Sequence, residues 1–152
     1  MEAPDLLAAT EAARAEGLNV VLVEQPYRVA GRRSPAPAAQ LDVAWTAVVE
    51  ALRGEVLSER PLVVGGRSLG ARVACRTAEA VGAVAVLCLA FPLEPPARAG
   101  KPRQSRLAEL DVFGAQRPSA PGHERRDHGL PVRLPAEHAR GPLTHILVAP
   151  LS

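Results

Sequence analysis

Aromatic side chains are scarce in this sequence, and neither sign of charge is in large excess. Phe, Trp and Tyr together make up 3% of the 152 residues, and the formal net charge is +2. Proteins that bind nucleic acid usually present a concentrated basic surface, often with aromatic side chains that stack on bases. The arginines of this chain are scattered and have no aromatics between them, so we expect no nucleic-acid partner.

Cysteine is equally rare, and its two copies do not form a framework. Cys75 and Cys88 both lie in apolar segments, which is typical of buried free thiols in a reducing compartment. The cysteines and the four histidines show no spacing that suits metal ligands. We therefore expect neither a structural disulfide framework nor a metal, and no motif points to another cofactor.

Long apolar runs are missing as well. The longest, residues 83–92, has about half the length that a membrane-spanning helix needs. The first residues include Glu2 and Asp5, whereas a secretory signal begins with a basic segment. We expect a cytoplasmic protein without a membrane segment, and the length suits one domain over residues 1–152.

What the sequence does contain is a regular alternation of helical and strand patterns over residues 1–92. Short continuous apolar runs are typical of strands buried on both faces. The alternation predicts an α/β protein with three layers and a mostly parallel central sheet, whose ligands bind at the carboxyl ends of the strands. The expected helices are residues 4–16, 38–53 and 71–80, and the expected strands are 19–24, 61–64 and 83–90.

Residues 93–152 have a different character. Ten of the 15 prolines follow Phe91. Residues 93–106 suggest a loop, 106–110 a turn of helix, and 144–151 a weakly indicated strand or helix. Because no firm strand is predicted after Phe91, the α/β fold is expected to be incomplete and irregular in this part of the chain.

The sharpest motif is Gly66-Arg67-Ser68-Leu69-Gly70, a G-x-S-x-G pattern between a predicted strand and a predicted helix. In this context the pattern indicates a nucleophile elbow, in which a serine sits at the tip of a strained turn. Gly66 and Gly70 lack side chains that would crowd such a turn. The positive end of the helix then faces Ser68, and the Leu69 N–H becomes a donor to an oxyanion. A glycine-rich loop without a catalytic role is the alternative.

A nucleophilic serine needs an imidazole to accept its proton and a carboxylate to orient that imidazole. In α/β-hydrolases the acid and then the histidine follow the serine along the chain. We predict Asp111 as the acid and His128 as the base, because glycine-containing turns follow both. Asp127 is the rival acid, ranked second because adjacent side chains rarely point at each other. The other histidines that follow Ser68 are His123, His138 and His145.

Several segments resemble small bacterial α/β-hydrolases, near the dienelactone-hydrolase relatives and the testis-expressed hydrolase-like branch. The resemblance implies a Ser-Asp-His triad of Ser68 in Gly-Gly-Arg-Ser, Asp111 in Asp-x-Phe-Gly and His128 in Asp-His-Gly. It is dense over residues 4–96 and patchy beyond. The segments that carry it are residues 4–7, 23–31, 65–74, 89–93 and 127–129.

The chain departs from that family pattern in two places. Family members have a strand and a His-Gly-Ala-Gly-Gly segment before the equivalent of Pro4 and Asp5, and that segment supplies a second oxyanion donor. They also have a Val/Leu-rich strand that leads into the equivalent of Asp111. The resemblance implies that both are missing here, through a late start codon or an internal deletion.

These features together predict a serine hydrolase that acts on a small-molecule acyl substrate, as an esterase or thioesterase. Loss of one oxyanion donor costs about a hundred- to a thousandfold in rate. The alternative is therefore a weak or inactive hydrolase-fold protein that serves as a binding module. The sequence does not define the substrate or the oligomeric state.

Overall fold

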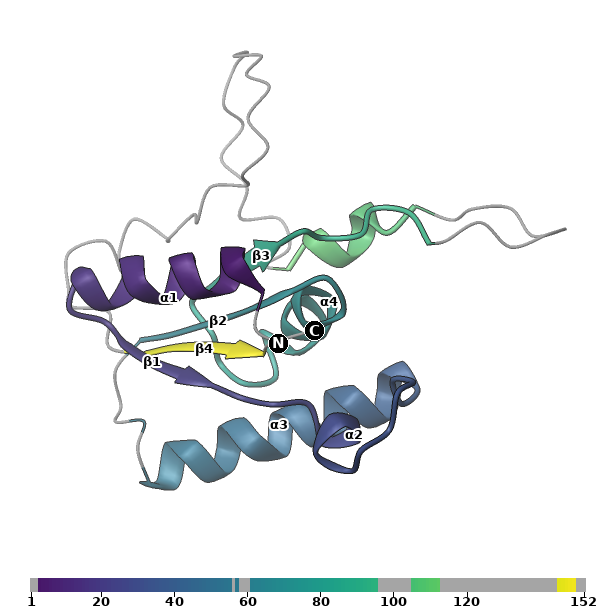
Figure 1. Cartoon of the computed structure of the whole chain (residues 1–152), viewed down its shortest axis with the longest axis horizontal. Helices are drawn as coiled ribbons and strands as arrows, with labels where there is room; N and C mark the ends of the chain where they lie inside the picture. Colours follow the sequence, from purple (N-terminus) through teal and green to yellow (C-terminus); the bar gives the residue numbers. More distant parts are fainter. Residues whose placement is uncertain (1–2, 56, 58–60, 96–104, 113–144, 150–152) are drawn as a thin grey trace, which may run out of the picture.

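A parallel sheet of four strands lies between helices in the structure, a computed structural model (Figure 1). The structure describes residues 3–55, 57, 61–95, 105–112 and 145–149. The strand order is β1-β4-β2-β3, and all three pairings are parallel. The predicted α/β class with a parallel central sheet is thus confirmed. The strands are β1 (Asn19–Leu22), β2 (Leu62–Arg67), β3 (Ala85–Leu89) and β4 (His145–Ala149).

The helices follow the predicted pattern, with one addition. The expected helix starts at Pro4 and Ala38 are confirmed, and the elbow helix begins two residues earlier than predicted. The addition is α2, which lies just beyond the expected strand 19–24, where the sequence predicts no helix. Pro26 begins it, because proline has a preset φ and no N–H to leave unpaired at a helix start. The helices are α1 (Pro4–Ala15), α2 (Pro26–Val29), α3 (Ala38–Glu55), α4 (Leu69–Thr77) and the 3₁₀ helix η1 (Leu107–Leu110).

Two hydrophobic cores flank the sheet, because successive strand residues point to opposite faces. Val63 packs with Leu6 and Ala13 of α1, whereas Val64 packs with Trp45 of α3 and Val73 of α4. Helix α1 therefore covers one face of the sheet, and α3 and α4 cover the other (Figure 1). This arrangement gives the three predicted layers.

Helix α4 packs closely against the sheet through small side chains. Ala71, Ala74 and Ala78 have no exposed surface, and Cys75 is 5% exposed. A helix with such a face approaches a sheet more closely than one with Leu or Ile there. The close approach brings the start of α4 directly onto the end of β2.

Strand β4 corrects the expectation that no firm strand follows Phe91. Its backbone lies between β1 and β2, with Leu147 opposite both Val21 and Val64. Residues 145–149 read weakly as a strand because they are short and lack flanking signals. Their central position depends on partners more than 75 residues earlier in the chain, which a local pattern does not contain. The 3₁₀ helix at 107–110 agrees with the expected absence of a strand leading into Asp111.

The tightest backbone contact in the described part of the elbow is at Gly66. A Cβ atom there would lie 2.4 Å from the carbonyl carbon of Gly70 and 2.8 Å from the nitrogen of Ala71. No side chain rotation relieves a clash with backbone atoms. The predicted role of Gly66 in the turn therefore has a direct steric cause.

We predict that Gly66→Ala lowers the free energy of unfolding by at least about 2 kcal/mol, because the β2–α4 turn must open to admit the methyl group. Urea titration followed by circular dichroism measures the change. Gly54→Ala in α3 is the matched control, since a Cβ atom there meets no atom within 4 Å. That variant should keep or gain stability, and an equal loss in both would contradict the steric explanation.

Candidate active site at the β2–α4 elbow

Ser68 occupies the turn between β2 and α4 in a backbone conformation that is rare for a residue with a side chain. Its φ is 52° and its ψ is −108°. Such conformations cost about 1–3 kcal/mol and persist only where surrounding contacts enforce them. Here the Ser68 N–H donates to the Leu89 carbonyl of β3 at 2.9 Å, and Gly66 abuts the start of α4. These contacts hold the serine in its strained position.

The Ser68 hydroxyl does not cap the helix that follows it, which is the usual role of a serine before the first turn of a helix. Ser68 is the N-cap residue of α4, yet its side chain makes no capping hydrogen bond. An N-cap serine normally accepts a hydrogen bond from the N–H two or three residues later. The residue is partly exposed and lies outside both cores. Its hydroxyl is therefore free to meet a ligand at the carboxyl edge of the sheet.

Leu69 follows as the first residue of α4. The N–H groups of a first helical turn have no acceptor within the helix, and the helix dipole adds partial positive charge there. An anion next to Ser68 would meet both. The neighbouring Arg67 binds Asp5 of α1, with its Nε 3.1 and 3.0 Å from the two carboxylate oxygens. This ion pair ties the first turn of α1 to the elbow.

Asp111, the predicted acid, lies at the end of η1 and is exposed. It lines a cavity with Cys75 and Arg76 of α4 and with Glu79, which follows that helix. Cys75 is seven residues beyond Ser68, which corresponds to about 10 Å along a helix axis. Asp111 therefore lies beside the end of α4 that is far from Ser68.

The predicted base, His128, and the rival acid, Asp127, lie outside the described residues. So do His123 and His138. His145 is the first residue of β4 and pairs with Leu62, the first residue of β2. Since Ser68 follows the other end of β2, about 20 Å of strand separates their backbones. His145 is thus placed at the wrong edge of the sheet to serve Ser68.

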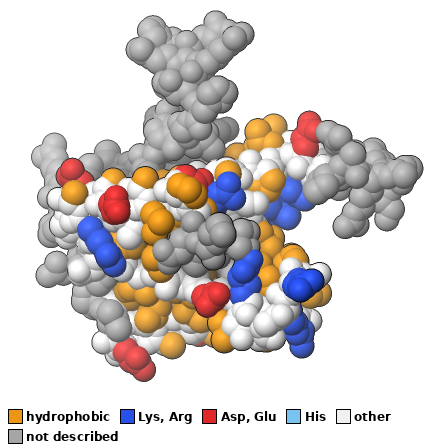
Figure 2. Space-filling model, in the orientation of Figure 1, with side chains coloured by type: hydrophobic (Ala, Val, Ile, Leu, Met, Phe, Trp, Pro, Cys, Tyr) orange, Lys and Arg blue, Asp and Glu red, His pale blue; other side chains and the backbone are white. Residues whose placement is uncertain are grey.

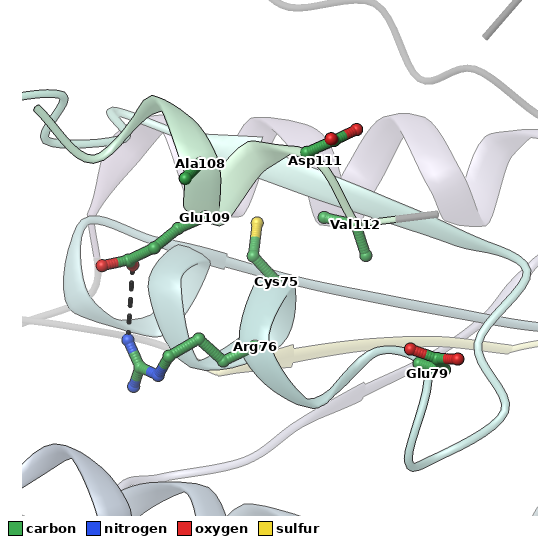
Figure 3. Close-up of a pocket in the computed structure, with 7 residues that line it drawn as sticks. All are labelled: Cys75, Arg76, Glu79, Ala108, Glu109, Asp111 and Val112. Carbon is green, nitrogen blue, oxygen red and sulfur yellow. Dashed lines mark hydrogen bonds and ion pairs between the residues drawn. The ribbon is translucent and has the colours of Figure 1, made fainter. Parts of the chain in front are cut away.

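Side chains of α3, α4 and η1 form an ion-pair cluster, and Figure 3 shows its Arg76–Glu109 pair beside the cavity. Glu109 accepts hydrogen bonds from Arg72 Nε at 2.8 Å and Arg72 Nη2 at 2.7 Å. Arg76 Nη1 lies 3.4 Å from Glu109 Oε2, while Arg76 Nε and Nη2 donate to the two carboxylate oxygens of Asp42, at 2.8 and 2.6 Å. These bonds fix η1 against α4 and thereby set the position of Asp111.

The cluster shifts the titration of its members. Hydrogen bonds from Arg72, and the nearby charges of Arg72 and Arg76, hold the pKa of Glu109 below its ordinary value, although partial burial opposes this. The hydrogen bond to Asp42 raises the pKa of Arg76. Glu109 therefore stays ionised in the folded protein at pH values where a free glutamate would be protonated.

The described surface in view in Figure 2 is electrostatically mixed. Figure 2 shows basic and acidic side chains interspersed with hydrophobic atoms on the face in view, without a large area of one sign. Within the described ranges, no group of three or more His, Cys, Asp or Glu side chains is placed to hold a metal ion. None of the described helices has the length and apolar character to cross a bilayer.

Two features of the site region were not anticipated from the sequence. One is the Arg72–Glu109 pairing, although the four-residue spacing of Arg72 and Arg76 does indicate one polar face on α4. The other is Ala90, which directly follows β3 and has a φ of 45°. Ala90 follows Leu89 and Ser68 follows Arg67, and Leu89 and Arg67 are paired in the parallel sheet. The two residues with positive φ are therefore neighbours. No common sequence signal marks an alanine for this conformation.

Comparison with known proteins points to one family. A model of the "Alpha/beta hydrolase domain" matches residues 1–116, which include both β2 and the elbow. No curated protein and no solved structure matches the chain significantly. The match covers more than half of the chain, and it ends a few residues beyond Asp111.

The depressed pKa of Glu109 predicts a pH dependence of stability. A carboxylate whose folded pKa lies below its ordinary value of 4.5 contributes stability above that pH and loses it as the pH falls through the folded pKa. Glu109→Gln should therefore lower the free energy of unfolding by about 1 kcal/mol at neutral pH. Its stability should fall less steeply than that of the wild type below pH 4.5, as measured by urea titrations across the acid range.

Glu79→Gln is the control for this prediction, because Glu79 lines the same cavity and has no recorded ion pair among the described side chains. Its stability profile should follow that of the wild type. Identical profiles for Glu109→Gln and wild type would show that the ion pairs of Glu109 do not contribute.

Proposed function

The chain belongs to the alpha/beta hydrolase family, and on that premise we propose that it is a serine hydrolase of the esterase or thioesterase type. The observation that carries the proposal is Ser68 itself. A strained residue at a helix N-terminus, whose hydroxyl does not cap the helix, is characteristic of a nucleophile held ready for a ligand. The substrate class proposed is a small acyl ester or thioester.

In the proposed reaction the Ser68 hydroxyl attacks the acyl carbon and passes its proton to His128. The Leu69 N–H donates a hydrogen bond to the oxyanion, supported by the positive end of α4. His128 then protonates the leaving group, and water releases the acyl group from Ser68 in a second round of the same chemistry. Asp111 orients His128 in this scheme.

The acid is the part of the triad that most needs a test. Asp111 lies beside the end of α4 that is far from Ser68. Its role as the acid that orients His128 therefore has to be compared with that of Asp127. An acid that only stabilises the fold and an acid that orients the histidine respond differently to an Asp→Asn substitution. An amide at the orienting position leaves the imidazole in the wrong tautomer, which lowers the reactivity of the serine without unfolding the protein.

We predict that a fluorophosphonate probe labels the wild-type protein and does not label Ser68→Ala. The reason is that the probe reacts only with an activated serine hydroxyl. Gel fluorescence and intact mass report the adduct, and peptide mapping places it. Ser34→Ala, in an exposed loop, is the matched control and should label as the wild type does. An unlabelled, folded wild type would instead support the inactive binding module.

The same probe separates the acids. We predict that Asp111→Asn and His128→Ala each reduce the labelling rate by at least about a hundredfold, whereas Asp127→Asn leaves it within a few-fold. Circular dichroism of each variant checks that the fold is kept. The reverse order for the two aspartates would assign the acid to Asp127 and leave the role of Ser68 intact.

A further inference from the structure

Two thiols meet between α4 and β3. The Sγ atoms of Cys75 and Cys88 lie 3.4 Å apart, and neither belongs to a disulfide. Cys75 belongs to the small-residue face of α4 that packs on the sheet. Val86 of β3 packs against the core on the side of the sheet that α4 covers. Side chains two residues apart on a strand point to the same face, so Cys88 points to that side as well. The close packing of α4 thus brings together residues that are 13 positions apart.

We propose that Cys75 and Cys88 form a site of reversible oxidation, at which hydrogen peroxide converts the two thiols into a disulfide between α4 and β3. A disulfide needs the sulfur atoms to approach to about 2.0 Å. From their present separation of 3.4 Å the two sulfur atoms must approach by about 1.4 Å. The proposal does not depend on any catalytic role of Ser68.

The cavity beside α4 offers the oxidant a route to the thiol pair, because Cys75 lines the cavity and Cys88 Sγ lies 3.4 Å from Cys75 Sγ. Its volume is about 360 Å³, and Cys75 contributes to its wall (Figure 3). Glu79, Glu109 and Asp111 line it against a single basic side chain, Arg76. This acidic lining disfavours an anionic oxidant such as glutathione disulfide. Hydrogen peroxide is small and uncharged, and it fits both the size and the charge of the cavity.

The hydrogen bond between the thiols gives them different roles. It holds the pKa of Cys88 below its ordinary value, although burial opposes the effect, and it raises the pKa of Cys75 together with burial. Cys88 is also the more exposed of the two. Because the thiolate is the reactive form, Cys88 is the sulfur that peroxide oxidises first, and Cys75 is the one that closes the disulfide.

The chemistry balances with one peroxide molecule. The Cys88 thiolate attacks a peroxide oxygen, the O–O bond breaks, and the departing hydroxide takes up the proton that Cys88 had released, which gives water and a sulfenic acid. The Cys75 sulfur then attacks the Cys88 sulfur, the S–O bond breaks, and hydroxide leaves with the Cys75 proton as a second water. Two thiols are oxidised and one peroxide is reduced. A dithiol reductant restores the pair.

The test exposes the full chain to hydrogen peroxide in the presence of dimedone, which traps sulfenic acids. The folded wild type should give a Cys75–Cys88 cross-linked peptide in unreduced mapping, a loss of two free thiols and little dimedone adduct, because the neighbouring thiol closes faster than the trap reacts. In urea the same chain should give mostly adduct. The cross-link should also raise the urea midpoint, because it restricts the unfolded chain.

Two variants make the result decisive. Cys75→Ser keeps a hydrogen-bond donor beside Cys88 and should collect dimedone on Cys88. Cys88→Ser should leave Cys75 largely unmodified at the same peroxide concentration. Free thiols in peroxide-treated wild type, adduct without cross-link in the folded chain, or cross-links only between molecules would each overturn the proposal.

Discussion

The contact between Gly66 and the first turn of α4 is the constraint on which the elbow depends. Because a Cβ atom there would lie 2.4 Å from the carbonyl carbon of Gly70, the end of β2 can lie this close to the start of α4 only with glycine at position 66. The chain must then reverse within two residues, and Ser68 takes the positive φ that this requires. The small face of α4 continues the close approach along the helix. One steric requirement thus exposes a serine at one end of α4 and brings Cys75 to Cys88 near the other.

A second constraint comes from the order of the strands. In the described part of the sheet, β1 and β2 are both paired to β4 and not to each other. The backbone pairing of residues 145–149 with both strands therefore holds β1 in register with the elbow strand. The carboxyl ends of β1 and β2 lie at one edge only because this late segment runs parallel between them. The ion pair of Arg67 with Asp5 is exposed and contributes little beside those bonds.

The sequence predicted those parts of the fold that depend on local pattern. Apolar runs located β1, β2 and β3, the helical pattern of residues 38–53 located α3, and the glycine spacing around Ser68 located the elbow. It could not place β4 at the centre of the sheet, since that position depends on backbone pairing with distant strands. The Arg72–Glu109 pair and the Cys75–Cys88 contact also depend on tertiary packing, and α4 shows only that one face is polar and the other small. The predicted roles of Asp111 and His128 depend on resemblance and chain order, and neither of these gives the distances between the side chains and Ser68.

Glu109 links these separate features. Its bonds to Arg72 and Arg76 hold η1 on α4, and the side chains that flank Glu109 then line the cavity above Cys75. Val112, just beyond η1, packs against the core that α3 and α4 share, so the segment is anchored at two points. An acid at position 111 is consequently fixed beside the end of α4 that is far from Ser68. For Asp111 to orient a histidine that serves Ser68, that histidine must reach along the side of the helix. The comparison of the Asp111 and Asp127 variants therefore tests how far η1 determines the chemistry at the elbow.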